Sequence, residues 1–323
     1  MVWKETAAHI TQISLPLDRI DSKLQMLASL RPLPSSAIQK IRDTLAIEWT
    51  YHSNAIEGNT LTLPETLAVI SDGITVKGKS LREHLEAVNH YEAIEKVVEL
   101  AQPGVVISEK ILLDIHALVL QKIEKEFAGR YRNVGVRITG ANFIPPNPVK
   151  VPDMMEELMS WLYENPLQLH PLLLATIFHH RFVWIHPFID GNGRTVRLMH
   201  NLLLMALGYP PVIILKQDRL KYYKALNEAN EGKFEALALL MVQAAERSLD
   251  IYLSNLEGAA EDYMPISQLV EEDEVPYGEE YIGLLARRGK IDAYKEGRVW
   301  YTKKSAVDDY MRGRKRKRTV EKY

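Results

Sequence analysis

Hydrophobic residues recur at helical spacing through most of the first 257 residues. Positions three and four apart share one face of a helix, so this spacing predicts amphipathic helices rather than strands. We expect helices over residues 36–56, 81–100, 108–124, 153–164, 171–185, 195–207 and 234–256. Thr62 and Glu65 have the spacing of a capping box that opens a further helix. Gly58, Gly104 and Gly208 stand just after the expected ends of three helices.

Residues 130–152 break the helical pattern. Val134, Val136 and Ile138 alternate with polar or small residues, and a Gly-Ala-Asn turn follows them. This pattern predicts a short hairpin that leads into an extended, Pro-containing segment. A lone hairpin on a helical body has little apolar surface of its own to bury. We therefore interpret the segment as a surface flap.

The character of the sequence changes after about residue 260. Residues 258–276 are acidic and irregular, which we interpret as a linker between separately folded domains. Residues 277–311 predict a helix, two short strands around Glu296-Gly297 and a second helix. The basic residues 312–323 are expected to be disordered. The predicted division of this mainly α chain is a helical N-terminal region (1–105), a helical core (106–257), the linker (258–276), a small α+β domain (277–311) and a basic tail (312–323).

Composition limits the class of protein. The 323 residues are 46% hydrophobic and 25% charged, as in a soluble globular protein of about two domains. The absence of cysteine excludes disulfides, thiol catalysis and thiolate-bound zinc, and it fits a reducing compartment. Neither a signal-peptide core nor a run of about 18 apolar residues is present. We expect a cytoplasmic protein with no membrane partner.

Residues 186–197, HPFIDGNGRTVR, join two apolar helices through a loop too turn-prone to be helical. Its glycines would let an anion approach the outward-pointing N–H groups of a helix N-terminus. Arg194 and Arg197 share a face of the first helical turn. Two cations at a helix N-terminus are unfavourable because they oppose the helix dipole, unless an anion lies between them. Asp190 is suited to bind Mg²⁺, and His186 to accept a proton from a hydroxyl. A plain connector would explain any one of these residues, but not all of them within twelve positions.

This segment resembles, at every defined position, the signature of the Fic family, His-Pro-Phe-x-Asp-Gly-Asn-Gly-Arg-x-x-Arg. The resemblance extends over about residues 40–250. It implies a Fic-fold core and transfer of AMP from ATP to a Ser, Thr or Tyr hydroxyl of a target protein. It also implies that His186 is the general base and that Asp190 binds Mg²⁺. The implied phosphate-binding residues are Gly191, Asn192, Gly193, Arg194 and Arg197.

Two other segments match the family more loosely. In residues 221–232, Tyr223 and Asn230 correspond to positions that shape the adenine pocket, although a helix with tyrosines packed in the core is the alternative. The flap would pair with an extended target segment through main-chain hydrogen bonds. Its implied target-binding residues are Val136, Ile138, Phe143 and Ile144.

A second motif, SNAIEGN at residues 53–59, places Ser53 and Glu57 on one helix face. A carboxylate at a helix C-terminus is unfavourable, so Glu57 needs a cationic partner. On its own, the motif would be an ordinary surface glutamate before a helix end. It is similar to the Fic inhibitory pattern Ser/Thr-x-x-x-Glu-Gly/Asn. This resemblance implies that Glu57 contacts Arg197, takes the place of the γ-phosphate and makes the chain self-inhibited.

The two ends of the chain differ in charge. Residues 281–323 contain 14 Lys and Arg against 5 Asp and Glu, whereas the first 280 residues contain 26 against 37. Residues 277–311 resemble the small winged helix-turn-helix units of excisionase-like DNA-binding proteins, in which basic side chains face phosphates. DNA contact is one expectation for this unit, and a docking or dimerisation module is the other.

These features together predict an autoinhibited protein adenylyltransferase that uses ATP and Mg²⁺ to modify a target protein or itself. De-adenylylation or transfer of another nucleotide by the same site are the enzymatic alternatives. A DNA-binding regulator with a nucleotide-sensing Fic domain is the alternative from another class. A homodimer is compatible with all of these, although no residue establishes one.

Overall fold

The structure is a computed structural model that describes residues 14–30, 35–256, 263–272, 275–296 and 298–320. The chain forms two compact units. Unit 1 contains residues 38–241, and unit 2 combines residues 14–37 with residues from 242 onward. The helices α3 (Ser35–Ile56) and α11 (Glu235–Leu256) each run from one unit into the other.

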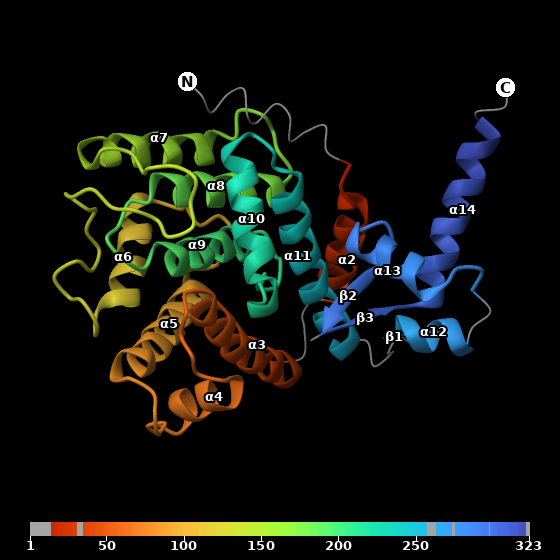
Figure 1. Ribbon diagram of the computed structural model, residues 1–323, viewed down its shortest axis with the longest axis horizontal. Helices are drawn as coiled ribbons and strands as arrows, with labels where there is room; N and C mark the ends of the chain where they lie inside the picture. Colours follow the sequence, from red (N-terminus) through yellow and green to blue (C-terminus); the bar gives the residue numbers. More distant parts are fainter. Residues whose placement is uncertain (1–13, 31–34, 257–262, 273–274, 297, 321–323) are drawn as a thin grey trace. The chain divides into compact units, whose positions relative to one another are not determined.

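Unit 1 is helical in the part of the chain that the structure describes (Figure 1). Besides the parts of α3 and α11 that it includes, its helices are α4 (Leu63–Ser71), α5 (Leu81–Leu100), α6 (Glu109–Leu120), α7 (Val151–Glu164), α8 (Pro171–Ile185), α9 (Asn192–Ala206) and α10 (Arg219–Asn230), with short 3₁₀ turns at Pro148–Lys150 and Lys216–Asp218. Except for α4 and α10, these helices were predicted from hydrophobic spacing, and α6 ends at Leu120 rather than at the predicted residue 124. The predicted capping box is also present, because Thr62 accepts from the Glu65 backbone and Glu65 bonds the Thr62 N–H in return.

The core of unit 1 is built around α8 and α9. Residues 172–182 of α8 and 194–204 of α9 are buried without a break. A helix that is buried on every face lies inside a helical bundle rather than on its surface. Figure 1 shows α9 among its neighbours: it packs against α8, α5 and α6. The loop between α8 and α9 is therefore fixed at both ends by core helices.

The predicted hairpin in the flap is wrong, because residues 131–147 contain turns and extended chain but no strand. An isolated two-stranded hairpin is marginal in water, and the prolines of this segment cannot donate to a ladder. The carbonyls of Val134 and Pro146 instead accept hydrogen bonds from the buried Arg132 guanidinium, at 3.0 and 2.7 Å. The segment keeps the name flap below, defined as residues 134–146.

Unit 2 contains α2 (Leu17–Ser29), the C-terminal part of α11, β1 (Met264–Pro265), α12 (Ile266–Glu272), α13 (Glu279–Arg287), β2 (Ala293–Glu296), β3 (Val299–Thr302) and α14 (Lys304–Val320). Its three strands are antiparallel in the order β1-β3-β2. The helix, two strands and helix expected over residues 277–311 are α13, β2, β3 and the start of α14. Gly297, in the expected turn, lies outside the described residues.

Two expectations for the C-terminal region need correction. Residues 258–276 are not simply a linker, because Met264 pairs with Thr302 and the buried Ile266 and Leu269 belong to the core of unit 2. The acidic residues there hid the apolar face of the short α12. The basic tail is helical as far as Val320, since Lys and Arg are good helix formers that extend α14.

An ion cluster ties α2 into unit 2. The Lys23 ammonium lies 2.6 Å from carboxylate oxygens of Asp250 and Asp292 and 3.1 Å from Glu246. The three carboxylates are close enough together to resemble a metal site. Lys23 already contacts all three, however, so the cluster is a buried ion network.

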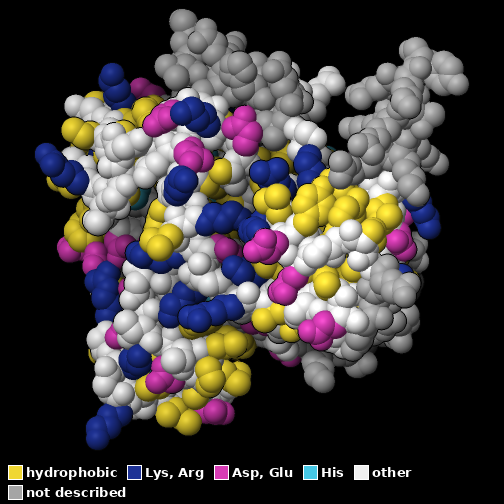
Figure 2. All heavy atoms as spheres, turned by 45° about the vertical axis from the view of Figure 1, so that its right-hand side comes forward, with side chains coloured by type: hydrophobic (Ala, Val, Ile, Leu, Met, Phe, Trp, Pro, Cys, Tyr) yellow, Lys and Arg dark blue, Asp and Glu magenta, His cyan; other side chains and the backbone are white. Residues whose placement is uncertain are grey.

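On the face shown in Figure 2, basic, acidic and hydrophobic side chains are intermingled. Among the described residues, every helix is either too short or too polar to span a lipid bilayer.

Candidate active site

The loop of residues 186–191 is held by backbone geometry at both ends. His186 caps α8 in the left-handed conformation, with φ +50°, which is uncommon for a residue other than glycine. Gly191, with φ +78°, is the N-cap of α9. The Asn192 side chain accepts from the Phe188 N–H and donates to the Phe188 carbonyl, both at 2.9 Å. The side chain predicted to cradle phosphate thus closes the loop, and the Gly191 N–H donates to Asp190 Oδ1 at 2.6 Å.

His116, on α6, was not predicted, and it contacts this loop at Phe188 and Asp190. Its Nδ1 accepts from the Gly129 N–H at 3.0 Å, so Nε2 carries the proton and donates to the Asp190 carbonyl at 3.0 Å. The imidazole stacks on Phe188 with ring centroids 3.5 Å apart. Burial lowers the pKa of His116 to about 4. The neutral ring therefore holds the carbonyl of Asp190 in place.

Arg194 and Arg197 are both buried at the start of α9, with exposures of 3% and 4%. Arg194 donates to Asp190 at 3.2 Å. Nε of Arg194 and Nη1 of Arg197 find no hydrogen-bond acceptor within the described ranges, and Nη1 of Arg194 makes only an ion pair with Glu86 Oε1, at 3.5 Å. Buried guanidinium N–H groups without acceptors are costly. An anion at the N-terminus of α9 would satisfy them.

The Glu57 carboxylate lies at this N-terminus. Its Oε1 atom accepts from Arg197 Nη2 at 2.8 Å. It also lies so close to Gly193 that a Cβ on that residue would be 2.1 Å from Oε1. Only glycine leaves room for the carboxylate at this point. The predicted meeting of Glu57 and Arg197 is present in the structure.

Ser53 shares in this contact from the preceding turn of α3. Arg197 Nε donates to Ser53 Oγ at 2.9 Å, and Nη2 donates to the Ser53 carbonyl at 2.8 Å. Ser53 is 1% exposed, so these bonds are shielded from water. One guanidinium therefore binds both residues of the second motif, across about 140 positions of sequence.

The end of α3 is also held from α10. Arg219 Nε and the Tyr223 hydroxyl both donate to the Ile56 carbonyl, at 2.7 and 3.1 Å. The last carbonyls of a helix lack intrahelical donors, so this pair caps α3. Tyr223 was predicted to shape an adenine pocket, and here it contacts the C-terminal end of α3. Arg219 was not predicted.

Other predicted residues connect the flap to α8 and α10. Asn230 accepts from the His180 ring at 2.9 Å and donates to Asn142 of the flap at 3.0 Å. Phe143 stacks on Trp184 of α8, with ring centroids 5.7 Å apart. Ile144 is 74% exposed and is thus available to a partner. Val136 and Ile138 are partly buried.

Asp190 offers a carboxylate at the edge of the site. Burial would raise its pKa, but the Arg194 charge, the Gly191 N–H and Arg82 together hold the pKa below its usual value. Its Oδ2 contacts Arg82 at 2.6 Å, and Arg82 is a surface residue of α5 that was not predicted. An ionised, cation-bound carboxylate beside an anion nest fits Mg²⁺ held jointly with phosphate oxygens.

His186 is poised as a base. Its Nδ1 faces the Val183 carbonyl at 3.4 Å; a carbonyl only accepts, so Nδ1 carries the proton and Nε2 keeps its lone pair. Burial lowers the pKa of His186 to about 4; Arg132 adds to this effect, and Glu57 and Asp190 oppose it. The ring is therefore neutral near pH 7 and can accept a proton.

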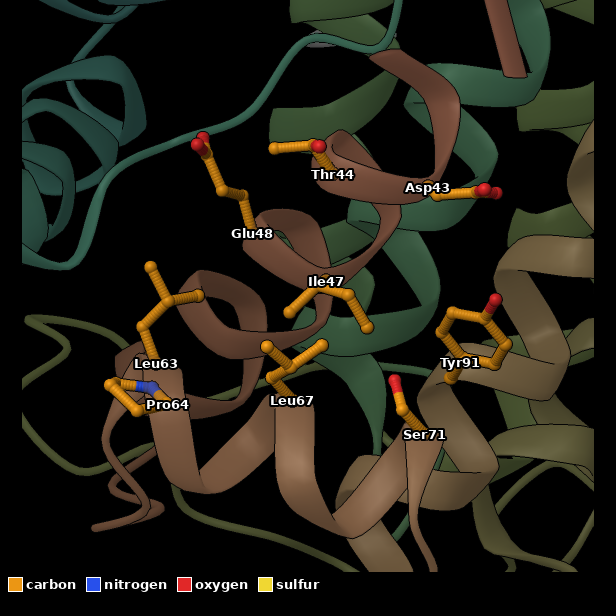
Figure 3. Close-up of a pocket in the computed structure, with 9 residues that line it drawn as sticks. All are labelled: Asp43, Thr44, Ile47, Glu48, Leu63, Pro64, Leu67, Ser71 and Tyr91. Carbon is orange, nitrogen blue, oxygen red and sulfur yellow. The ribbon is translucent and has the colours of Figure 1, made fainter. Parts of the chain in front are cut away.

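A separate cavity of about 610 Å³ lies between α3, α4 and α5 (Figure 3). Its lining includes Ile47 of α3, Leu67 of α4 and Tyr91 of α5, and Asp43 and Glu48 line it as well. No residue of the 186–197 motif lines it.

Comparison with known proteins identifies the site's relatives. The model of the Fic/DOC family matches residues 106–204, which include the whole 186–197 motif. Over 241 residues the chain is 39% identical to Protein adenylyltransferase Fic of Nematostella vectensis, covering 74% of this chain and 56% of that protein. Its namesake in Culex quinquefasciatus is 38% identical over 238 residues, covering 73% and 47%. The chain spans about half the length of these curated relatives.

Solved structures agree with this comparison. A Fic domain containing signaling protein from Bacteroides thetaiotaomicron superposes with a TM-score of 0.68 at 26% identity, covering 75% of this chain and 97% of that one. Residues 134–508 of Fic-1 from C. elegans give a TM-score of 0.63 at 31% identity, covering 75% and 74%. A Fic family protein from Desulfovibrio desulfuricans gives 0.62 at 25% identity and covers 90% of this chain and 96% of that one.

Proposed function

The chain belongs to the Fic/DOC family, and on this premise we propose that it is a protein adenylyltransferase inhibited by Glu57 of its own chain. The observation that carries the proposal is the Glu57 carboxylate at the N-terminus of α9, bonded to Arg197 and packed against Gly193. A carboxylate there is a stand-in for a phosphate. The curated relatives in the sea anemone and the mosquito are named as protein adenylyltransferases, which supports AMP as the transferred group.

In the proposed reaction a target hydroxyl attacks the α-phosphorus of ATP. A new bond forms between the target oxygen and this phosphorus, and the bond from the phosphorus to the bridging oxygen of the β-phosphate breaks. Pyrophosphate leaves with its electron pair, and the hydroxyl proton passes to Nε2 of His186. His186 is suited to this role because its Nδ1 already carries a proton, which leaves the lone pair of Nε2 free to accept the proton of the hydroxyl.

The phosphates would lie where Glu57 lies now. The backbone N–H groups of Asn192 and Gly193 would cradle them, joined by that of Gly191 if it gives up its present bond to Asp190 Oδ1. The N–H groups of Arg194 and Arg197 that have no hydrogen-bond acceptor would neutralise the β/γ end. Asp190 would hold Mg²⁺, which when bound supplies charge stabilisation to the phosphates. Asp190 would have to exchange its contact with Arg82 for the metal.

Inhibition then follows from competition for Arg197. Its guanidinium cannot bond Glu57 and a γ-phosphate at one position at the same time. While α3 is in place, ATP would be held in a pose that does not favour in-line attack. Ser53 strengthens the brake, because it holds the same guanidinium from the other side.

The adenine would lie against α10, and the target would lie along the flap. Tyr223 and Asn230 remain the proposed adenine-binding residues, and binding would change their present contacts with Ile56 and Asn142. The target would pair with the flap backbone beside Val136 and Ile138, while Phe143 and the exposed Ile144 contact its side chain.

The test is intact-mass spectrometry of the Glu57→Gly variant after incubation with ATP and Mg²⁺. We expect added AMP on the variant, little on the wild type, and none on the double variant that also carries His186→Ala. A Glu57→Gly protein that stays unmodified with ATP would contradict the proposal. The same assay with the other nucleoside triphosphates would then test transfer of another nucleotide.

De-adenylylation is a second candidate, because the Glu57 charge acts on His186 across the site. In this role Glu57 would position a water for attack on an AMP-modified side chain. Wild-type chain should then strip AMP from pre-modified Glu57→Gly protein, whereas His186→Ala chain should not. Stable modification in the presence of wild type would leave Glu57 as a brake alone.

DNA contact by unit 2 remains a proposal. Arg287, Arg288 and Arg298 are exposed, as an interface with phosphates requires. Lys303 does not fit this role, since it pairs with Asp292 at 3.4 Å. Anisotropy of a labelled duplex should show binding that weakens steeply with salt. Salt-insensitive or absent binding would favour a docking module instead.

A further inference from the structure

Arg132 is a buried arginine whose charge is not matched by a carboxylate. It is 3% exposed, and within the described part of the chain its guanidinium bonds only carbonyl oxygens. Burial lowers its pKa. A buried charge without an ionic partner is costly, so the contacts that keep it there indicate what it does.

The guanidinium reaches two separate segments. Nε donates to the His186 carbonyl at 2.8 Å, and Nη2 also lies 3.4 Å from the Ile185 carbonyl. From the flap, the Val134 and Pro146 carbonyls accept from Nη1 and Nη2 at 3.0 and 2.7 Å. The fixed planar fork of arginine makes such divergent bonding feasible, and a lysine ammonium cannot reproduce it.

One end of this arrangement stabilises the backbone of the general base. His186 has φ +50°, a conformation that costs free energy in a residue with a Cβ. The carbonyls of Ile185 and His186 are at the C-terminal end of α8, where a cation is favourable. In addition, the Arg132 backbone N–H donates to the Pro187 carbonyl at 2.9 Å. Arg132 therefore bonds to the chain on both sides of the His186 Cα atom.

The other end fixes the flap. Val134 and Pro146 are its first and last residues, and no strand ladder takes their carbonyls. One guanidinium closes the two ends of the flap and joins them to His186. A displacement of either segment would break bonds to the other, so their relative positions are coupled.

We propose that Arg132 is a positioning residue that holds the general base and the target-binding flap in one frame. A hydroxyl presented by a target on the flap would then meet Nε2 of His186 at a fixed distance. This inference rests on the proposed function, but it concerns a residue outside both motifs.

The charge of Arg132 adds an independent consequence. It disfavours protonation of His186, in the same direction as burial, while Glu57 and Asp190 act in the opposite direction. Loss of this charge should therefore raise the pKa of His186. A residue that served only to fill space would not change this titration.

The test uses full-length Glu57→Gly protein with Arg132→Gln, Arg132→Lys or Arg130→Gln added. Arg130 is the matched control, because it is an exposed arginine two residues away. At saturating ATP and Mg²⁺ we expect Arg132→Gln to slow auto-modification at least about 10-fold, since small misplacements of reacting groups are expensive. The Kd of a non-hydrolysable ATP analogue should change less than about 2-fold. Arg130→Gln should match the parent in both.

The second readout does not depend on turnover. The His186 ring proton is assigned in the NMR spectrum of the parent by its loss in His186→Ala. Its titration midpoint should rise in Arg132→Gln and stay near the parent value in Arg132→Lys, which keeps the charge but slows transfer. If Arg132→Gln does not fold, as judged by thermal unfolding, Arg132→Lys alone tests the positioning role through transfer rate and Kd.

The outcomes distinguish a failure of the proposed AMP transfer from a failure of the positioning role of Arg132. A parent that transfers no AMP contradicts the proposed function, and the titration then still tests whether Arg132 acts on His186. A folded Arg132→Gln protein with the parent's transfer rate and the parent's titration overturns the inference. A parallel loss of rate and nucleotide affinity would also overturn it, because that result indicates general damage.

Discussion

At the scale of single residues, the site is organised around the Arg197 guanidinium. Its Nη2 bonds Glu57 and the Ser53 carbonyl, its Nε bonds Ser53 Oγ, and its Nη1 has no acceptor among the described residues. The side chain is 4% exposed, so each of these groups is cut off from water. A guanidinium in this state stabilises whichever anion satisfies it best. A few hydrogen bonds would therefore decide the proposed competition between Glu57 and a phosphate.

Ser53 gives the most direct test of this competition. Ser53→Ala removes the hydroxyl that accepts from Nε at 2.9 Å while leaving the backbone contact. A hydrogen bond to a charged group contributes about 1.5–3 kcal/mol. We expect auto-modification in ATP and Mg²⁺ to lie between that of the wild type and that of Glu57→Gly. Measured by intact mass, Ser53→Ala should add nothing in the Glu57→Gly background, and an additive increase would assign Ser53 another role.

At the scale of elements, the proposed inhibition would depend on the position of α3 as well as on Glu57 itself. The helix is capped by Arg219 and Tyr223 of α10, which both donate to the Ile56 carbonyl. The capped residue directly precedes Glu57. A shift of α3 against α10 would therefore move the carboxylate relative to α9.

Arg219→Gln should loosen this attachment. We expect more auto-modification than in the wild type and less than in Glu57→Gly, because Glu57 keeps its bond to Arg197 but its helix loses a donor at 2.7 Å. Lys224→Gln is the matched control, since Lys224 lies on the same helix with an 80% exposed side chain. Wild-type levels of AMP on Arg219→Gln protein would mean that Arg197 alone holds the brake.

Some of these elements and contacts could be predicted from the sequence, and others could not. Most helices of unit 1 followed from hydrophobic spacing and α4 began at its predicted capping box, whereas α2, α10 and α12 were not predicted from the spacing. The pairing of Glu57 with Arg197 came from family resemblance, since spacing alone gives no contact across 140 positions. Arg132 was missed because its partners are carbonyls, which every residue has and no sequence pattern marks. The flap hairpin was wrong because residue alternation does not reveal whether a ladder or a side chain will satisfy the backbone.

At the scale of the whole molecule, burial disfavours the charged form of titratable groups in both units, so it raises the pKa of an acid and lowers that of a histidine. In unit 2, burial raises the pKa of Asp250 to about 7. Between pH 7 and about 4 the folded chain therefore binds a proton on Asp250 that the unfolded chain does not, so this group makes folding more favourable as the pH falls. In unit 1, burial lowers the pKa values of His116, His180, His186 and His200 to about 4. The pKa values of His90 and His179 are lowered further. These six histidines outnumber the opposing Asp250.

The chain should therefore lose stability in mild acid. Between pH 6.5 and about 4 the unfolded chain binds protons on these histidines that the folded chain excludes. Their stabilisation is complete above pH 6.5 and is lost as the pH falls toward 4, at up to about 1.4 kcal/mol per pH unit for each histidine. Urea unfolding at a series of pH values measures this slope. His200→Gln should make it shallower by one histidine's share, and an unchanged slope would mean that His200 is already protonated in the folded chain.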